Sequence, residues 1–227
     1  MGSDLVLMPP ILLEACVETP AGALAAEEGG AGRIELCASL EVGGLTPPRA
    51  LVEECVRRLS IPVFVLARPI PGPFVISPKE LARLLKDIRQ AADQGAAGVV
   101  AGALTAAGAV DERALEAILA AAGPLPVTFH RAFDAAADQS SAVEVLARCG
   151  VGRVLTSGGA ATAAQGAGRI KALVERAAGR IGILAGGSIR AHNAAALVRA
   201  TGVTEIHSRT PEDPVAVRAL VAAANGA

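Results

Sequence analysis

The sequence contains no tryptophan and no tyrosine, and it has only four phenylalanines in 227 residues. Its 21 Lys and Arg residues nearly balance its 22 Asp and Glu residues, so the formal net charge is −1. A nucleic-acid-binding protein usually carries a basic surface and aromatic side chains on which bases stack. Because this chain has neither, its composition excludes nucleic acid as an expected partner.

Long apolar runs are also missing, and no segment has the roughly 18 consecutive apolar residues that a membrane-spanning helix requires. Residues 1–8 contain Asp4 but neither Lys nor Arg, unlike the basic start of a secretory signal peptide. No CxxC pair occurs among the cysteines, which are Cys16, Cys37, Cys55 and Cys149. This spacing favours reduced thiols over a disulfide framework. We therefore expect a cytoplasmic protein without a membrane segment.

What the chain does have is a regular alternation of two kinds of segment. Hydrophobic residues make up 52% of it and charged residues 19%, which excludes intrinsic disorder. Eight short apolar runs occupy residues 11–16, 33–37, 62–67, 97–101, 126–130, 153–156, 181–185 and 205–208. Eight Ala- and Leu-rich amphipathic stretches occupy residues 20–28, 48–59, 78–94, 111–121, 140–149, 165–177, 191–201 and 214–224.

The alternation predicts the fold class. Strand followed by helix favours a parallel sheet, and the repeat length suits βα units. Eight units in 227 residues predict an α/β protein with a closed, TIM-like (β/α)8 barrel. We expect one domain over residues 1–227, in which residues 1–10 form an extended lead-in. An open doubly wound sheet is disfavoured because no GxGxxG turn follows the first run.

In barrels of this type, functional residues gather at the carboxyl ends of the strands. Two acid–thiol pairs lie there. Glu14 and Cys16 are two positions apart and share one face of their strand, and Glu35 and Cys37 repeat the pattern on the next strand. Because neighbouring strands are about 4.8 Å apart, we expect the carboxylates and thiols to meet in two layers.

The two thiols allow two interpretations. Adjacent thiolates suit Cu(I) or another thiophilic metal, whereas buried cysteines also serve simply as small apolar residues. The glutamates need cationic partners inside an apolar run, for which we expect Arg68 and Arg131. A buried ion network that holds the barrel together is the structural alternative.

The segment that follows the fifth run also carries chemistry. His130 is a candidate general acid or base, Asp134 a candidate to orient it, and Arg131 a candidate clamp for an anion. A capped surface loop would contain the same residue types.

Two glycine-containing turns follow the sixth and seventh runs. Glycine lets the backbone approach a ligand, helix N-termini attract anions, and late barrel loops often bind phosphate. A tight turn alone would also accept glycine. The candidate ligand- or phosphate-binding residues are Arg131, Ser157, Gly158, Gly186, Gly187, His207 and Ser208, with Arg190 as an added charge.

Several longer strings are distinctive. They include Leu13-Glu14-Ala15-Cys16, Arg33-Ile34-Glu35-Leu36-Cys37, Gly43-Gly44-Leu45-Thr46-Pro47, Thr128-Phe129-His130-Arg131-Ala132-Phe133-Asp134 and Glu205-Ile206-His207-Ser208. With these strings, the sequence resembles the CutC family of copper homeostasis proteins from about residue 13 to residue 208.

The resemblance implies a TIM-like barrel in a cytoplasmic, often dimeric protein associated with copper handling. It also implies that Cys16 and Cys37 match the cysteines proposed as Cu(I) ligands in the family. The third loop departs from the family, because Ile70, Pro73 and Ile76 replace an arginine, an aspartate and an aromatic residue. Three polar or aromatic groups of the third loop are therefore lost from this sequence.

Two functions follow as hypotheses. The first is a copper homeostasis protein that binds Cu(I), its expected cofactor, through Cys16 and Cys37, linearly or with a third donor. The second is a barrel enzyme of isomerase or lyase type acting on a small anionic substrate, such as a phosphorylated one. Its candidate catalytic residues are Glu14, Glu35, Arg68, His130 and Asp134. No organic cofactor is indicated, a homodimer is expected, and a scaffold acting through its dimer surface is a third alternative.

Overall fold

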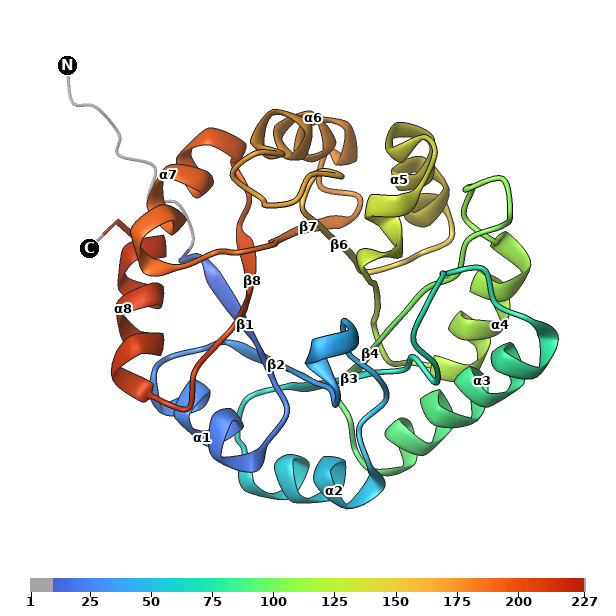
Figure 1. Cartoon of the computed structure of the whole chain (residues 1–227), viewed down its shortest axis with the longest axis horizontal. Coiled ribbons are helices and arrows are strands. Elements are labelled where there is room, and N and C mark those ends of the chain that lie inside the picture. The colour runs from blue at the N-terminus through green and yellow to red at the C-terminus, as the bar shows by residue number, and fades with distance from the viewer. Residues whose placement is uncertain (1–9, 227) are drawn as a thin grey trace.

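The computed structural model describes residues 10–226. Eight parallel strands pair in chain order and close into a barrel, since β1 also pairs with β8 (Figure 1). The strands are β1 (Leu12–Val17), β2 (Arg33–Leu36), β3 (Val63–Leu66), β4 (Gly98–Ala101), β5 (Val127–Phe129), β6 (Arg153–Thr156), β7 (Gly182–Gly186) and β8 (Glu205–Arg209). The predicted (β/α)8 barrel is confirmed. The predicted lead-in lies almost wholly outside the described residues.

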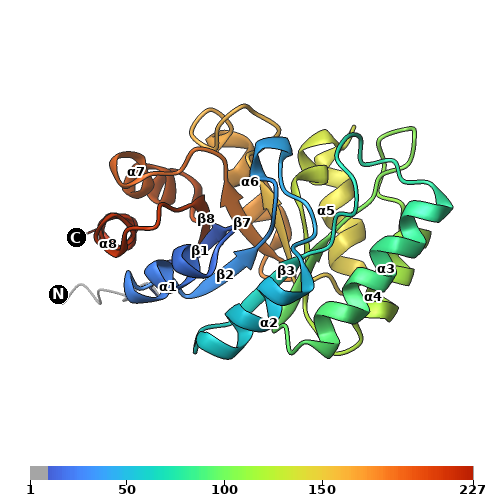
Figure 2. The same ribbon diagram turned by 60° about the horizontal axis from the view of Figure 1, so that its bottom comes forward.

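Eight helices form a ring around the strands (Figures 1 and 2). They are α1 (Pro20–Glu28), α2 (Arg49–Arg58), α3 (Pro78–Asp93), α4 (Glu112–Ala122), α5 (Gln139–Arg148), α6 (Ala167–Ala177), α7 (Ala191–Thr201) and α8 (Pro214–Ala224). Within the described residues, none of these helices is long and apolar enough to cross a membrane. Strand and helix boundaries agree with the predicted ones to within two residues.

Two short 3-10 helices, Leu40–Val42 and Arg131–Ala135, occupy loops for which the sequence predicts no helix. The first lies in the connection after β2, which Figure 1 shows reaching over the centre of the barrel. The second begins directly after His130, whose Nδ1 accepts a hydrogen bond from the Ala132 amide. Both are on the side of the barrel where the strands end.

Local sequence explains where the helices begin. Ser77 accepts a hydrogen bond from the Glu80 amide, the Glu80 carboxylate accepts from the Ser77 amide, and Pro78 occupies the first helical position of α3. Such a capping box satisfies amides that a helix start leaves without partners, and proline there sacrifices no hydrogen bond. At α8, Asp213 caps the helix by accepting a single hydrogen bond from the Val215 amide at 2.9 Å, and Pro214 follows it.

The alternation of side chains on each strand separates two cores. On β1, Leu13, Ala15 and Val17 belong to the large apolar core between strands and helices. Cys16 belongs instead to a small cluster inside the barrel, whose buried members are Cys16, Cys37, Phe64, Leu66 and Val100. Successive residues of a strand point to opposite faces, so one short strand serves both cores.

Candidate functional site

A cavity of about 170 Å³ lies at the carboxyl end of the barrel. It is lined by Cys16, Glu35, Cys37, Leu40, Gly43, Leu66, Arg68, Phe74, His130, Arg131, Leu155 and His207. The structure therefore brings seven of the predicted site residues to one cavity, namely Cys16, Glu35, Cys37, Arg68, His130, Arg131 and His207. Ile70, Pro73 and Ile76 do not line it.

The two thiols lie side by side at this cavity. Cys16 Sγ is 3.6 Å from Cys37 Sγ, and Cys37 Sγ donates to the Val17 carbonyl at 3.4 Å. Both residues are buried. The hydrogen bond to Cys37, burial and the neighbouring Glu35 charge raise the pKa of the Cys16 thiol well above its ordinary value. This thiol is therefore protonated at neutral pH, and a metal that binds it must displace the proton.

Below the cavity lies a set of paired charges, which we call the ion-paired layer. It consists of Glu14, Arg33, Arg153 and Glu205. Arg33 donates to Glu14 Oε2 at 2.5 Å through Nε and to Glu205 Oε2 through Nη2. Arg153 donates to the same Glu205 oxygen at 3.2 Å. The guanidinium groups of Arg33 and Arg153 also lie about 5 Å from the centre of the Phe64 ring, within cation–π range.

The predicted partners of the glutamates are wrong. Parallel register makes Arg33 the direct neighbour of Glu14, whereas Arg68 follows β3 and lies nearer the mouth. Arg68 donates to the carbonyls of Val42, Gly44 and Gly72, and so joins two loops over the cavity. Arg131 binds Asp134 and donates to Ser157 Oγ at 2.9 Å.

Sequence reasoning missed Arg33, Arg153 and Glu205 as interior residues. The signal for two of them was present, because Arg33 precedes Glu35 by two positions and Glu205 precedes His207 by two. The same two-residue spacing that joins Glu14 with Cys16 places each of these pairs on one strand face.

Glu14 and Glu35 are both buried, but their electrostatic surroundings differ. Burial alone would raise the pKa of Glu14. The hydrogen bond and charge of His207, together with Arg33, outweigh burial and lower this pKa to about 2. For Glu35, burial dominates and the nearby Glu14 charge adds to it, so its pKa is raised despite the attraction of His207.

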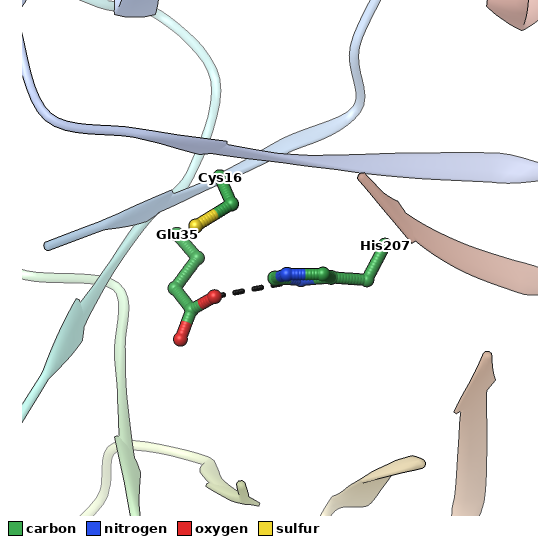
Figure 3. Close-up of side chains that lie close together, drawn as sticks. All are labelled: Cys16, Glu35 and His207. Atoms are coloured by element: carbon green, nitrogen blue, oxygen red, sulfur yellow. Dashed lines mark ion pairs between the residues drawn. The ribbon is translucent and has the colours of Figure 1, made fainter. Parts of the chain in front are cut away.

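His207 links the two carboxylates. Its Nδ1 lies 2.8 Å from Glu14 Oε1 and 3.4 Å from Glu35 Oε2. Burial lowers the pKa of His207, but the charges of Glu35 and Glu14 and the hydrogen bond to Glu14 raise it overall. Cys16, Glu35 and His207 each offer a metal-ligating atom within 4.8 Å of the other two, and Figure 3 shows these side chains converging. We call Cys16, Glu35, Cys37 and His207 together the thiol layer.

His130 is buried at the rim, and its environment favours the neutral imidazole. Burial and the charge of Arg68 lower the pKa of His130 to about 4. The Phe74 ring lies 5.1 Å from the imidazole. The expectation that Asp134 orients His130 is wrong, because the carboxylate turns toward the loop after β6.

The loop after β6 is held in place by the carboxylate of Asp134. Asp134 accepts hydrogen bonds from Thr156 Oγ1 at 2.6 Å and from the amides of Ser157 and Gly159 at 3.0 Å. The Gly158 amide donates to Thr156 Oγ1 at 2.8 Å. These are the amides that an external phosphate would use, and an arriving anion would compete with Asp134 for them.

The remaining predicted phosphate-binding residues lie away from the cavity. Gly187 accepts from the Ala163 amide, and Ser208 Oγ donates to the Ile189 carbonyl at 2.9 Å. A Cβ at Gly186 would lie 2.6 Å from Leu155, so this glycine allows close packing of β7 on β6. A larger cavity of about 590 Å³ lies beside α7 and α8, lined in part by Arg190 and Arg209, but none of the thiols borders it.

Comparison of the sequence with known proteins identifies the family of this chain. The CutC family profile matches residues 11–211. A Pasteurella multocida protein described as a family protein CutC is 45% identical over 195 residues, which cover 86% of this chain and 80% of the relative. The human copper homeostasis protein cutC homolog is 44% identical over 196 residues, covering 86% of this chain and 72% of the relative.

A solved structure agrees with the sequence comparisons. The crystal structure of a CutC protein from Streptococcus agalactiae superposes with a TM-score of 0.83 at 34% identity, covering 87% of this chain and 97% of that one. The residues that match the CutC family profile extend over β1 to β8, and so include every strand that contributes a side chain to the cavity. With the profile, the relatives and the fold in agreement, this chain belongs to the CutC family.

Proposed function

We propose that this protein is a cytoplasmic copper homeostasis protein that binds Cu(I) through Cys16 and Cys37. The observation that carries the proposal is the pair of buried thiols 3.6 Å apart at the edge of a cavity. Thiolate is the ligand type that Cu(I) prefers, and two thiolates on adjacent strands hold it with little rearrangement. The name of the human relative supports the same association with copper.

The sulfur separation bears on the coordination. With metal–thiolate bonds of about 2.3 Å, a linear S–Cu–S unit needs sulfurs about 4.6 Å apart. The observed 3.6 Å instead favours a bent arrangement with a third donor. His207 borders the same cavity, and its imidazole suits copper better than a carboxylate does, so His207 is the available third donor.

A small-molecule enzyme is the second candidate. One observation favours it, because a buried acid with a raised pKa, Glu35, shares the cavity with the neutral His130. A carboxyl group with a raised pKa and a neutral imidazole can serve as general acid and general base. The cavity volume argues against a large substrate, since about 170 Å³ is well below the roughly 300–1,000 Å³ of ordinary ligand pockets. An ion or a molecule of a few atoms fits better than a phosphorylated metabolite.

Cytoplasmic location and dimerisation belong to the same proposal. The four cysteines, all within the described residues, are free, which suits a reducing compartment. Exposed Val215 on α8 is one of the few large apolar side chains at the surface of the described residues. We expect a homodimer, to be measured by light scattering on the purified chain.

The test is an anaerobic Cu(I) competition titration under reducing conditions. The native protein is compared with Cys16→Ala/Cys37→Ala and with the control Cys55→Ala, which removes a buried thiol of α2 outside the cavity. We expect tight one-to-one binding in the native and control proteins and its loss in the double variant. Equal binding by all three proteins would refute a copper site at these cysteines.

A further inference from the structure

Cys16 belongs to two sets of metal donors at once. One set is the thiol pair with Cys37. The other set is Cys16, Glu35 and His207, whose ligating atoms lie within 4.8 Å of one another (Figure 3). Cys37 is not a member of this second set. Three strands, β1, β2 and β8, therefore contribute a thiol, a carboxyl group and an imidazole to one small space.

We propose that Cys16, Glu35 and His207 form a site for a divalent cation of the zinc type, whose ligands share only Cys16 with the Cu(I) pair. Thiolate, imidazole and carboxylate are the three side-chain ligands of Zn²⁺, and three protein ligands with one open position are typical of reactive zinc sites. Mg²⁺ and Ca²⁺ require sets of oxygen ligands, and Cu(I) prefers sulfur. The site does not depend on copper binding.

Glu35 is the strongest argument for an occupant. Its side chain is 6% exposed, yet among residues 10–226 its only ion-pair neighbour is His207. Glu14, at a similar depth, has both Arg33 and His207. Glu35 thus shares its one such neighbour with Glu14, and a buried carboxylate with so little compensation is costly unless it is further paired or coordinates a metal.

His207 is prepared to act as a ligand through one nitrogen. Glu14 is ion-paired with Arg33, so its anionic carboxylate accepts a hydrogen bond from the Nδ1–H of His207 at 2.8 Å. Within the described part of the chain, no hydrogen bond engages the other ring nitrogen, Nε2. A carboxylate that holds one nitrogen of a metal-binding histidine orients the ring for ligation through the other nitrogen. Because the neighbouring carboxylates raise the pKa of His207, a metal that binds Nε2 displaces a proton from it.

Charge balance also selects a divalent ion. A thiolate at Cys16 and a carboxylate at Glu35 together neutralise two positive charges, and the imidazole adds a neutral donor. A neutral assembly avoids the large cost of isolated charge in a buried site. The cavity lined by His130 and Arg131 lies next to the three ligands and has room for water or a small anion at a fourth position.

The experiment measures two metals on the same set of variants. Reduced full-length protein is titrated with Zn²⁺ and, separately, with Cu(I), each against a chelator of known affinity. Glu35→Gln breaks only the mixed set, and Cys37→Ser breaks only the thiol pair. We expect Glu35→Gln to weaken Zn²⁺ binding at least about 10-fold and to leave Cu(I) binding nearly unchanged, with the reverse pattern for Cys37→Ser. Cys16→Ser should weaken both.

Co²⁺ serves as a spectroscopic substitute for Zn²⁺. A sulfur-to-cobalt charge-transfer band should appear in the native protein and in Cys37→Ser, and it should disappear in Cys16→Ser. Glu35→Asp, which keeps a carboxylate, should retain more affinity than Glu35→Gln if the oxygen is a ligand. His192→Gln is the matched control, because His192 is exposed on α7 and outside the cavity. Thermal unfolding of each variant verifies the fold.

The outcomes separate the two proposals. No Zn²⁺ binding by the native protein, or equal Zn²⁺ affinity in Glu35→Gln, overturns the divalent site. Equal losses of both metals in Glu35→Gln and in Cys37→Ser overturn the division into two donor sets. If the variants change Zn²⁺ binding as expected but the native protein does not bind Cu(I), the divalent site is supported. The proposed copper site is then refuted.

Discussion

The interior of the barrel has two layers with different arrangements of charge. In the ion-paired layer, Glu14 and Glu205 each contact an arginine, and Phe64 packs against both arginines. In the thiol layer, Glu35 forms no ion pair with an arginine of residues 10–226, and its neighbours are a histidine and a thiol. β1, β2 and β8 contribute to both layers, and β6 adds Arg153 to the ion-paired layer, so the choice of strands alone does not cause the difference.

The difference identifies which layer serves the fold and which serves a ligand. Charges that are already neutralised have little free energy to gain from an ion, whereas two thiols and a carboxyl group paired only with His207 have more to gain. The cavity borders Cys16, Glu35 and His207 but not Glu14 or Arg33. The layer nearer the strand ends is therefore the one available for binding, as in other barrels of this type.

The largest expected effect comes from breaking the ion-paired layer. Arg33→Met leaves Glu14 and Glu205 without their shared cation, and loss of one partner of a buried pair costs about 3–5 kcal/mol. Urea unfolding of the metal-free protein measures this loss in the free energy of unfolding. Arg49→Ala, which breaks an exposed pair with Glu53, is the control and should leave stability nearly unchanged. A loss in Arg33→Met no greater than in this control would contradict the buried-pair assignment.

The second prediction compares the two glutamates by pH. The folded pKa of Glu14, about 2, lies below its ordinary value of 4.5, so its contribution is present above pH 4.5 and is lost as pH falls toward 2. This contribution of Glu14 to the free energy of unfolding is on the order of 3 kcal/mol. The raised pKa of Glu35 gives the opposite pH dependence of stability. Its contribution is present below pH 4.5 and is lost as pH rises through the folded pKa.

Unfolding of metal-free protein with chelator present, from pH 3 to pH 8, tests both signs. Relative to native protein, Glu14→Gln should become less destabilised as pH falls. Glu35→Gln should gain relative stability as pH rises. Two difference curves of the same sign would show that the layers do not differ as described.

A smaller effect is expected at the mouth of the cavity. Arg68→Ala removes three hydrogen bonds to loop carbonyls, at Val42, Gly44 and Gly72, and should cost about 1–3 kcal/mol. The loops should then open more often, and backbone amides of residues 40–44 should exchange hydrogen faster while those of β3 stay protected. Unchanged exchange at residues 40–44 would show that Arg68 does not hold these loops.

The smallest expected effect concerns His130. Because Asp134 contacts the β6 loop and not the imidazole, Asp134→Asn should leave the pKa of His130 near its native value of about 4. A titration of the imidazole proton signals by NMR measures this. A large downward shift would restore the idea that Asp134 acts on His130.

The sequence alone determined the elements and the faces of the strands. The alternation of β-branched runs and amphipathic stretches located eight strands and eight helices, because both periodicities are local properties. The two-residue spacing of Glu14 and Cys16, and of Glu35 and Cys37, likewise predicted that the thiols meet. The motif strings indicated the family to which the chain belongs.

Only the tertiary structure decided which charged groups are partners. Register places Arg33 beside Glu14, and closure of the barrel brings His207 of β8 to Glu14 of β1, 193 positions away in sequence. Loop conformation directs Arg68 to carbonyls and Asp134 to amides. These contacts depend on how distant strands align, and no local pattern encodes that alignment. Composition and spacing therefore supply the donors of the site, while strand register and barrel closure determine which of them reach one another.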